Sequence, residues 1–141
     1  MALDMDKLNL FVGQFVGDLG AAVHSGMVVI GEKLGLYKAL AEGPLNSAEL
    51  AAKTRTDERY VREWLASQAA GGYVTYNEQT RKFSLSEEQA FTLANEDSPA
   101  YLPGAFQLAL CGNAIDQQSE TSSKVLIVSL KLQAYYSQGF L

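Results

Sequence analysis

Residues 44–85 read PLNSAELAAKTRTDERYVREWLASQAAGGYVTYNEQTRKFSL, and this stretch decides the fold. A helix is predicted to begin at Asn46, because an N-cap asparagine followed three residues later by Glu49 forms a capping box. A second helix follows the short turn 54–56, and Thr56 is predicted to be its N-cap. The pair Gly71-Gly72 supplies the left-handed C-cap that ends this helix.

The second helix and the residues after it complete the pattern. Apolar residues recur at helical spacing and predict one buried face, formed by Tyr60, Val61, Trp64, Leu65 and Ala69. Two runs of alternating character, 73–76 and 82–85, then flank the polar turn 77–81 and predict a β-hairpin. We therefore predict a mainly α fold with a small β-hairpin, that is, a winged helix-turn-helix preceded by N-terminal helices.

A winged helix often binds DNA, but the charges of this stretch disfavour that function. Between positions 46 and 85 the basic residues are nearly balanced by acidic ones: Lys53, Arg55, Arg59, Arg62, Arg81 and Lys82 against Glu49, Asp57, Glu58, Glu63 and Glu78. A DNA-binding protein typically neutralises about 6–10 phosphates. The formal net charge of the whole chain is −5, which also disfavours nucleic acid and anionic membranes as partners. A DNA-binding transcriptional regulator remains the alternative, and its contact surface would be formed by Arg55, Arg59, Arg62, Arg81 and Lys82.

Few residues of the chain suggest chemistry. Cys111 is the only cysteine and His24 the only histidine, and they lie far apart in the sequence, so we expect no catalytic or metal-binding residues. The absence of an intrachain cysteine pair fits a reducing compartment. The N-terminus carries Asp4 and Asp6 instead of a basic targeting segment, and we expect a cytoplasmic protein.

Residues 4–35 are predicted to be helical, with a break either at 17–20 or at Ser25-Gly26. A long apolar stripe runs along this segment, and Gly13, Gly17 and Gly20 would let another helix approach closely. We interpret it as a dimerisation element. The candidate contact residues are Leu8, Val12, Val16, Leu19 and Val23. The alternative is that the stripe folds back on its own winged helix.

After the hairpin, Ser86 and Gln89 form a second capping box and open a short helix. Ser98 and Pro99 are predicted to begin another helix, with a kink at Pro103-Gly104. Residues 112–123 have the composition of a linker, and 124–141 predict a strand or a short helix.

The segments 3–22, 28–76 and 96–110 together resemble the N-terminal region of a family of class I S-adenosylmethionine-dependent methyltransferases. They read LDMDKLNLFVGQFVGDLGAA, VVIGEKLGLYKALAEGPLNSAELAAKTRTDERYVREWLASQAAGGYVTY and EDSPAYLPGAFQLAL. The run TDERYVREWLASQAAGGYV is the most specific part. The resemblance implies a winged helix that helps to form a homodimer and covers the substrate pocket, while a separate Rossmann-like domain binds S-adenosylmethionine.

That catalytic domain has no counterpart after Leu110, where Gly112 and Gly139 are the only glycines and no glycine-rich loop occurs. We therefore expect this chain alone to be a non-catalytic fragment that binds no cofactor. Its expected partner is a second copy or a full-length relative. We expect no nucleic-acid partner and no association with a membrane. The candidates for covering a substrate are the aromatic residues Phe11, Phe15, Tyr101 and Phe106, although core or dimer contacts are an alternative role for them.

The predicted organisation has three parts. Residues 1–40 form an N-terminal helical dimerisation segment, and 41–111 form the winged helix-turn-helix domain with the helices that follow it. Residues 112–141 form a divergent tail.

Overall fold

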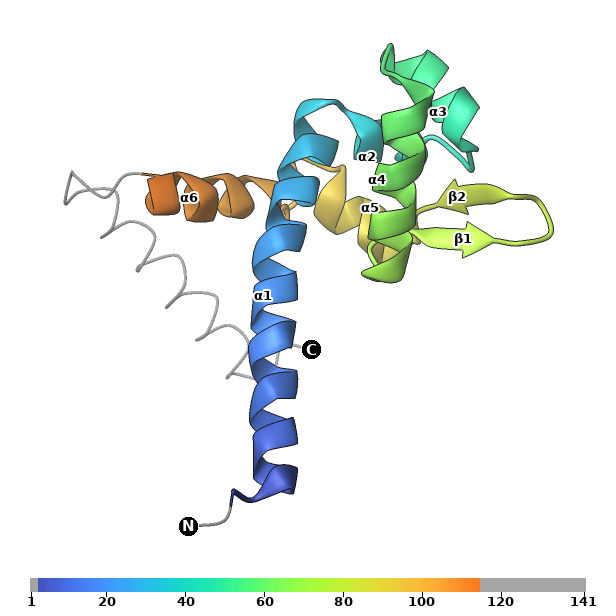
Figure 1. The fold of residues 1–141 in the computed structure, drawn as a ribbon. Helices are drawn as coiled ribbons and strands as arrows, with labels where there is room; N and C mark the ends of the chain where they lie inside the picture. Colours follow the sequence, from blue (N-terminus) through green and yellow to red (C-terminus); the bar gives the residue numbers. More distant parts are fainter. Residues whose placement is uncertain (1–2, 115–141) are drawn as a thin grey trace.

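The computed structural model describes residues 3–114 (Figure 1). The chain forms six helices and two strands within this range: α1 (Met5–Lys33), α2 (Leu36–Ala41), α3 (Ser47–Thr54), α4 (Glu58–Ala70), β1 (Thr75–Asn77), β2 (Lys82–Ser84), α5 (Glu87–Leu93) and α6 (Pro103–Ala114). The predicted fold class is confirmed, because α3, α4 and the hairpin β1–β2 form a winged helix-turn-helix.

The capping box of α3 is present as predicted. The Asn46 side chain accepts a hydrogen bond from the backbone N–H of Glu49, and the Glu49 carboxylate accepts one from the N–H of Asn46, both at 2.8 Å. The predicted cap of α4 is wrong by one residue. Asp57 is the N-cap and accepts from the N–H of Arg59 at 2.9 Å, whereas the Thr56 hydroxyl pairs with that of Thr54. A carboxylate at the cap also interacts favourably with the helix dipole.

The core lies where α2, α3 and α4 meet the C-terminal end of α1. Its buried apolar side chains include Val28, Leu36, Tyr37, Leu40, Leu50, Val61, Trp64 and Leu65. The prediction for Trp64 is confirmed, but that for Tyr60 is wrong, since Tyr60 is 72% exposed. The buried face of α4 is centred on Val61, Leu65 and Gln68, and Tyr60 lies at its edge in the first turn.

The wing is the predicted hairpin. Its strands are antiparallel, with Thr75 opposite Ser84 and Asn77 opposite Lys82. The Asn77 side chain closes the turn by accepting from the N–H groups of Gln79 and Thr80, each at 3.0 Å. Two backbone hydrogen bonds between Leu45 and Phe83, at 3.0 and 2.8 Å, attach the wing to the segment before α3.

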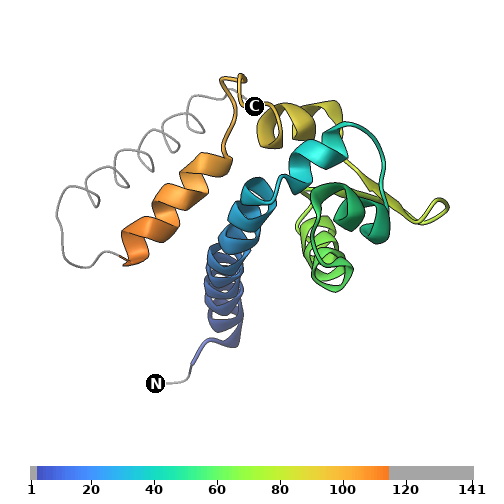
Figure 2. The ribbon, with the colours of Figure 1, turned by 90° about the horizontal axis from the view of Figure 1, so that it is seen from above.

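Helix α1 is continuous from Met5 to Lys33, so neither predicted break occurs. At Ser25 the side-chain hydroxyl donates to the carbonyl of Ala22 at 2.5 Å, which satisfies it within the helix. The helix ends at a left-handed Gly35, with φ 69°, and the chain turns into α2. Figures 1 and 2 show that the end of α1 near Lys33 joins the body of the fold, while the N-terminal part projects away from it.

Two contacts of aromatic rings join α1 to α4. The Trp64 indole N–H donates to the carbonyl of Met27 at 2.8 Å, and the indole ring covers Gly31. One turn further from the core, the His24 ring rests on Gly71 and meets Tyr73 edge-on, with ring centroids 4.6 Å apart. The His24 Nε2 atom is buried and has no hydrogen-bond partner among the described residues.

The start of the last helix differs from the prediction, whereas that of α5 does not. The capping box of Ser86 and Gln89 is confirmed at the start of α5. However, α6 begins at Pro103 and not at Pro99, because the Ser98 hydroxyl accepts from the N–H of Ala100 in a tight turn. A proline fits the first helical position, where its missing N–H costs no hydrogen bond.

Helix α6 also runs further than predicted. Residues 112–114, expected to begin a linker, form its last turn. The predicted strand or helix at 124–141 lies outside the described residues.

The contact between α1 and Trp64 generates a prediction for Gly31→Ala. A methyl group on Gly31 would overlap the Trp64 ring and lie 2.7 Å from Cε2 of Tyr37, and both rings are buried. We expect a loss of about 1–3 kcal/mol in the free energy of unfolding, as for overpacked cores. Chemical denaturation measures this change in the free energy of unfolding.

The control is Gly26→Ala, since a methyl there meets nothing within 4 Å. This variant should be unchanged or more stable by up to about 1 kcal/mol. Equal stabilities of the two variants would contradict the packing.

A second prediction concerns the pH dependence of stability. Loss of hydration on burial lowers the pKa of His24 below its ordinary value of 6.5. The unfolded chain then binds more protons than the folded chain as the pH falls through 6.5, so stability is full above this pH and decreases below it. We expect the free energy of unfolding to decrease between about pH 7.5 and about pH 5.5.

His24→Gln should flatten the profile over the same pH window. Glu49 and Glu88 do not interfere, because hydrogen bonds hold their pKa values below the ordinary 4.5. An identical slope in the wild-type protein and in His24→Gln would rule out this role of His24.

Candidate functional site

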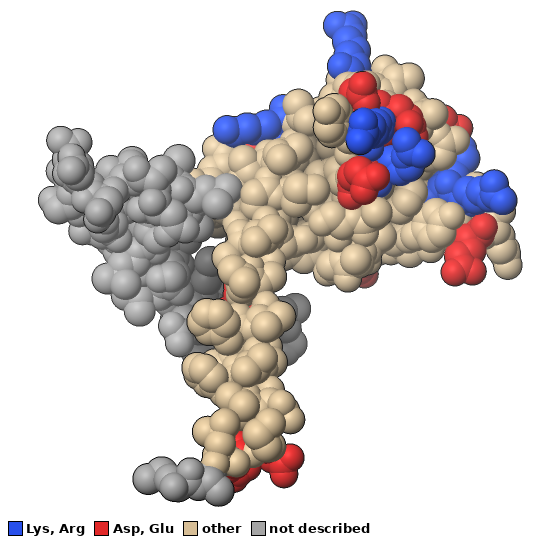
Figure 3. All heavy atoms as spheres, viewed as in Figure 1, with Lys and Arg blue, Asp and Glu red and all other residues tan. Residues whose placement is uncertain are grey.

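The most conspicuous surface of the described residues is the apolar side of projecting α1. Six of its side chains are each 48–68% exposed: Phe11, Val12, Phe15, Val16, Leu19 and Val23. Four of the predicted dimer-contact residues are in this set, and the fifth, Leu8, is half-buried. We call these six residues the α1 stripe. Figure 3 shows that the visible face of α1 has its charged side chains mainly at the tip.

A shallow apolar groove of about 360 Å³ adjoins the stripe on the side of α4. Two rows of α1 residues at i, i+4 spacing form its walls: Leu19, Val23 and Met27 in one row, Val16, Gly20 and His24 in the other. Ser67 of α4 contributes at one end. Gly20 contributes no side chain to the groove, and an added Cβ there would meet nothing within 4 Å. All its lining side chains are uncharged apart from the titratable His24, so the groove suits an apolar occupant.

The four aromatic substrate-cap candidates lie in two separate places. Phe11 and Phe15 are neighbours on α1, with ring centroids 6.5 Å apart. Tyr101, just before α6, and Phe106, in its first turns, are half-buried, and Phe106 packs against the core.

The first turns of α6 lie near the other end of α1, because Gln107 donates to the Glu32 carboxylate at 2.6 Å. Seventeen residues of helix, about 25 Å, separate Glu32 from Phe15. The two aromatic pairs therefore form no single site within one chain.

Tyr101 is half-buried and lies near two carboxylates. Burial is the largest cause that raises the pKa of its phenol, and the carboxylates of Glu32 and Glu96 add to it. Lys38 lies close by and pairs with Glu96 at 2.6 Å. The phenol thus remains protonated and can donate a hydrogen bond.

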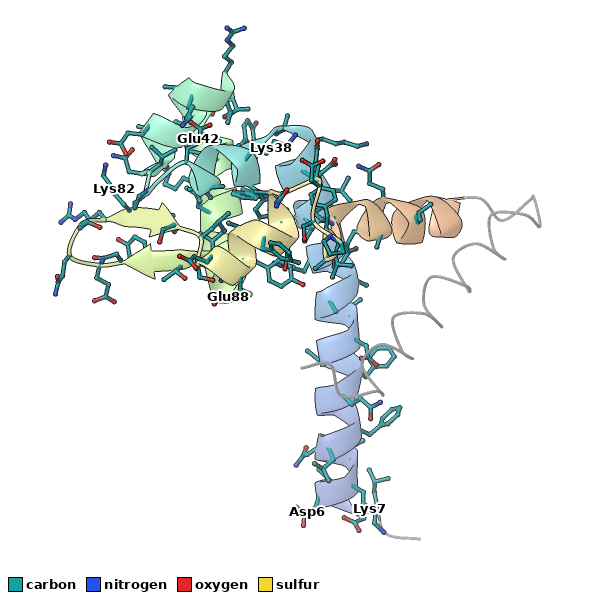
Figure 4. The ribbon with its side chains drawn as sticks, turned by 180° about the vertical axis from the view of Figure 1, so that it is seen from behind. Asp6, Lys7, Lys38, Glu42, Lys82 and Glu88 are labelled. Carbon is teal, nitrogen blue, oxygen red and sulfur yellow. The ribbon has the colours of Figure 1, made fainter. Side chains whose placement is uncertain are left out.

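Three of the six basic residues between positions 46 and 85 are paired with acidic ones. Lys53 pairs with Glu42 at 2.7 Å, and Lys82 pairs with Glu49 at 3.0 Å. Figure 4 shows Lys82 and Glu42 on this part of the body. On α4 itself, Arg62 pairs with Glu58 at 3.2 Å. These pairs reduce the positive charge available to a DNA backbone.

Further features bear on the kind of site. Within residues 3–114, no three His, Cys, Asp or Glu side chains are arranged to hold a metal ion. None of the helices in the same range combines the length and apolar character needed to cross a bilayer.

Sequence reasoning identified the stripe but missed the groove. The two rows of α1 were visible as i, i+4 spacing, whereas the contribution of Ser67 depends on how α4 packs.

The described fold is similar to parts of solved methyltransferase structures. CalO1, a methyltransferase in calicheamicin biosynthesis, is 26% identical with a TM-score of 0.57, and the match covers 74% of this chain and 30% of CalO1. The mitomycin 7-O-methyltransferase MmcR is 22% identical with a TM-score of 0.57, and the match covers 77% of this chain and 35% of MmcR. Human N-acetylserotonin methyltransferase is 18% identical with a TM-score of 0.57, and the match covers 76% of this chain and 31% of the human enzyme. This chain therefore spans about a third of the length of these enzymes.

The matched region corresponds to the N-terminal domains of S-adenosylmethionine-dependent O-methyltransferases. No curated protein matches the chain in sequence. Residues 22–95 match the family model of the Rv2258c-like winged HTH domain, which is more than half of the chain. The chain belongs to this family of winged helix-turn-helix domains.

Proposed function

We propose that this chain is the dimerisation and substrate-capping part of an S-adenosylmethionine-dependent methyltransferase and that it is inactive on its own. The observation that carries the proposal is the exposed α1 stripe. Burying apolar surface yields about 25 cal/mol per Å², and a contiguous uncovered patch of this kind typically marks an interaction site. The partner is a second copy of the chain or a full-length relative. Pairing with a full-length subunit would form an incomplete dimer and reduce its activity.

The capping role rests on the position and type of the aromatic residues. Phe11 and Phe15 present exposed rings on α1, and such rings suit a flat or apolar methyl acceptor. Phe106 of α6 and Tyr101 just before it would also contribute, with the protonated Tyr101 hydroxyl as a hydrogen-bond donor. Because the two pairs are separated within one chain, a complete cap requires an associated subunit.

Methyl transfer requires a site that aligns the methyl donor with the acceptor, since much of the rate comes from proximity. Among the similar structures, CalO1 is bound to SAH and human N-acetylserotonin methyltransferase is in complex with SAM. After Leu110 the present sequence has only the glycines Gly112 and Gly139 and no glycine-rich loop for a nucleotide. We therefore propose that this chain has no S-adenosylmethionine site.

We also propose that the protein is cytoplasmic and that it has no nucleic-acid partner. A single cysteine fits a reducing compartment. The ion pairs of Lys53, Arg62 and Lys82, together with the net charge of −5, disfavour the role of a DNA-binding regulator.

Light scattering after size exclusion tests the association. We expect the wild-type chain to be a dimer at about 100 μM, and Leu19→Asp to weaken the dimer at least about 100-fold, because it buries an unpaired carboxylate. The control is Leu10→Asp. Leu10 is 76% exposed, but it lies on the opposite side of α1, nine residues or about 900° of rotation from Leu19. A strictly monomeric wild-type chain would refute the association.

Isothermal titration with S-adenosylmethionine tests the absence of a donor site. We expect no binding heat with the 141-residue chain at ligand concentrations up to about 1 mM, because its sequence has no glycine-rich loop for the nucleotide after Leu110. A full-length methyltransferase related to this chain serves as the positive control in the same buffer. Saturable binding in the micromolar range by this chain would show that the proposal is wrong.

A further inference from the structure

We propose that residues 125–132 of this chain, which we call the docking segment, bind to α1 of the same chain. They cover the margin of the α1 stripe formed by Phe11 and Phe15. This contact limits association, because a partner that covers the α1 stripe has to displace the docking segment. The docking goes beyond the proposed function, and only its effect on association rests on that proposal.

The docking segment is strongly apolar. It reads VLIVSLKL, in which six of the eight residues are aliphatic and only Lys131 is charged. Removing aliphatic surface from water is favourable, so such a run tends to pack against another apolar surface. The α1 stripe is the largest set of exposed apolar side chains on one element of the described residues, and Phe11 and Phe15 are 65% and 62% exposed.

The position of α6 identifies the side of α1 that the docking segment reaches first. Glu32 faces α6, because its carboxylate accepts a hydrogen bond from Gln107 at 2.6 Å. With a rotation of about 100° per residue, Phe11 lies about 60° around α1 from Glu32. Phe15 lies about 100° from Glu32 in the same direction. These two rings therefore form the margin of the α1 stripe nearest to α6, whereas the groove lies on the side of α4.

The chain between α6 and the docking segment is long enough to reach this margin. From Gln107 to Ala114, α6 runs about 10 Å, and from Glu32 to Phe15, α1 runs about 25 Å. Figure 1 shows the two helices running crosswise, so the direct distance from Ala114 to Phe15 is shorter than the sum of ~35 Å. An extended chain covers about 3.3 Å per residue, so the stretch from Ala114 to Val125 spans up to about 36 Å.

Charge complementarity also favours this occupant. Residues 124–141 contain two lysines, Lys124 and Lys131, and no acidic residue. Asp18 is the only charged residue of α1 between Leu8 and Val23. It is exposed and lies about 40° around α1 from the position that faces α6, beside the margin of the stripe. An exposed ion pair adds little affinity, but it selects the orientation in which the docking segment lies on α1.

The covalent connection favours this contact over one with a separate molecule. A segment tethered through a short flexible stretch reaches an effective concentration in the millimolar range. A second copy at about 100 μM is then roughly tenfold more dilute than the docking segment. The docking segment thus competes with a partner for Phe11 and Phe15 and weakens the association without preventing it.

Cysteine cross-linking in the full chain tests the docking. Cys111→Ser removes the native thiol, and Phe15→Cys is combined with Leu126→Cys or with Leu130→Cys. At about 1 μM protein, we expect mild oxidation to form a disulfide within one chain, because the tethered thiol is present at a far higher effective concentration. Mass spectrometry of the monomer after proteolysis identifies the joined peptides.

The matched control for Phe15→Cys is Gly13→Cys. Gly13 lies at the same height on α1, about 160° around the helix from Phe15, and a side chain there has open space. Its disulfides with the same two tail positions should form at least about tenfold more slowly. Equal rates at positions 13 and 15 would overturn docking on this side of α1. Disulfides that form only between chains would overturn the intramolecular contact.

The effect on association is tested by the double variant Leu126→Gln and Leu130→Gln. It makes the docking segment more polar, and we expect the dissociation constant of the dimer to decrease at least about threefold, because the competitor is removed. The control is the double variant Ser129→Asn and Gln133→Asn, which changes two positions that are already polar. Light scattering over a concentration series measures both. Equal dissociation constants would overturn the competition.

The outcomes separate this inference from the proposed function. A dimer whose cysteine variants form no disulfide within one chain retains the association and overturns only the docking. A monomeric wild-type chain whose Phe15→Cys variants form that disulfide refutes the association and retains the docking.

Discussion

The packing of Trp64 and Tyr37 against Gly31 is the contact on which the rest of the structure depends. The two rings meet at 64° with centroids 5.1 Å apart, and the indole N–H is bound by the carbonyl of Met27. Only a glycine at position 31 allows α1 to come this close to them. The contact fixes the angle at which α1 leaves the body, and this angle leaves its N-terminal part uncovered. The α1 stripe is therefore a consequence of how the core is packed.

The winged helix-turn-helix of this chain illustrates how one fold supports different roles. In a DNA-binding member, the second helix of the motif would present free positive charge. Here Arg62 of α4 pairs with Glu58, and Lys82 of the wing is bound to Glu49 of α3. Helix α4 and the residue after it instead contact α1: Trp64 packs on Gly31, and Gly71 packs on His24. The motif forms the base from which the apolar helix α1 projects.

Local signals in the sequence were the most reliable guides to the fold. Both capping boxes and the hairpin were predictable, because side-chain to backbone hydrogen bonds within a few residues determine them. The errors arose where neighbouring residues compete for one role. Asp57 caps α4 although Thr56 could have done so, and Pro103 begins α6 although Pro99 has equivalent chemistry. Tyr60 has helical spacing with the core but lies at the edge of the buried face.

The candidate site was predictable only in part, for a related reason. A stripe on one helix is encoded by the spacing of its own residues, so the contact candidates from Val12 to Val23 could be named in advance. The groove depends on how two helices pack together, and the sequence does not show that His24 rests on Gly71 beside Ser67. The separation of Phe15 from Tyr101 likewise follows from the length and direction of α1.

The unbroken course of α1 has a mechanical consequence. A helix of 29 residues is about 43 Å long, and within residues 3–114 its buried residues all lie in its C-terminal third. Such a rod acts as a lever arm: a tilt of about 10° at this end would move a point ~30 Å away by ~5 Å, about one helical turn. Small adjustments in the packing around Met27 and Gly31 are thereby amplified at the tip.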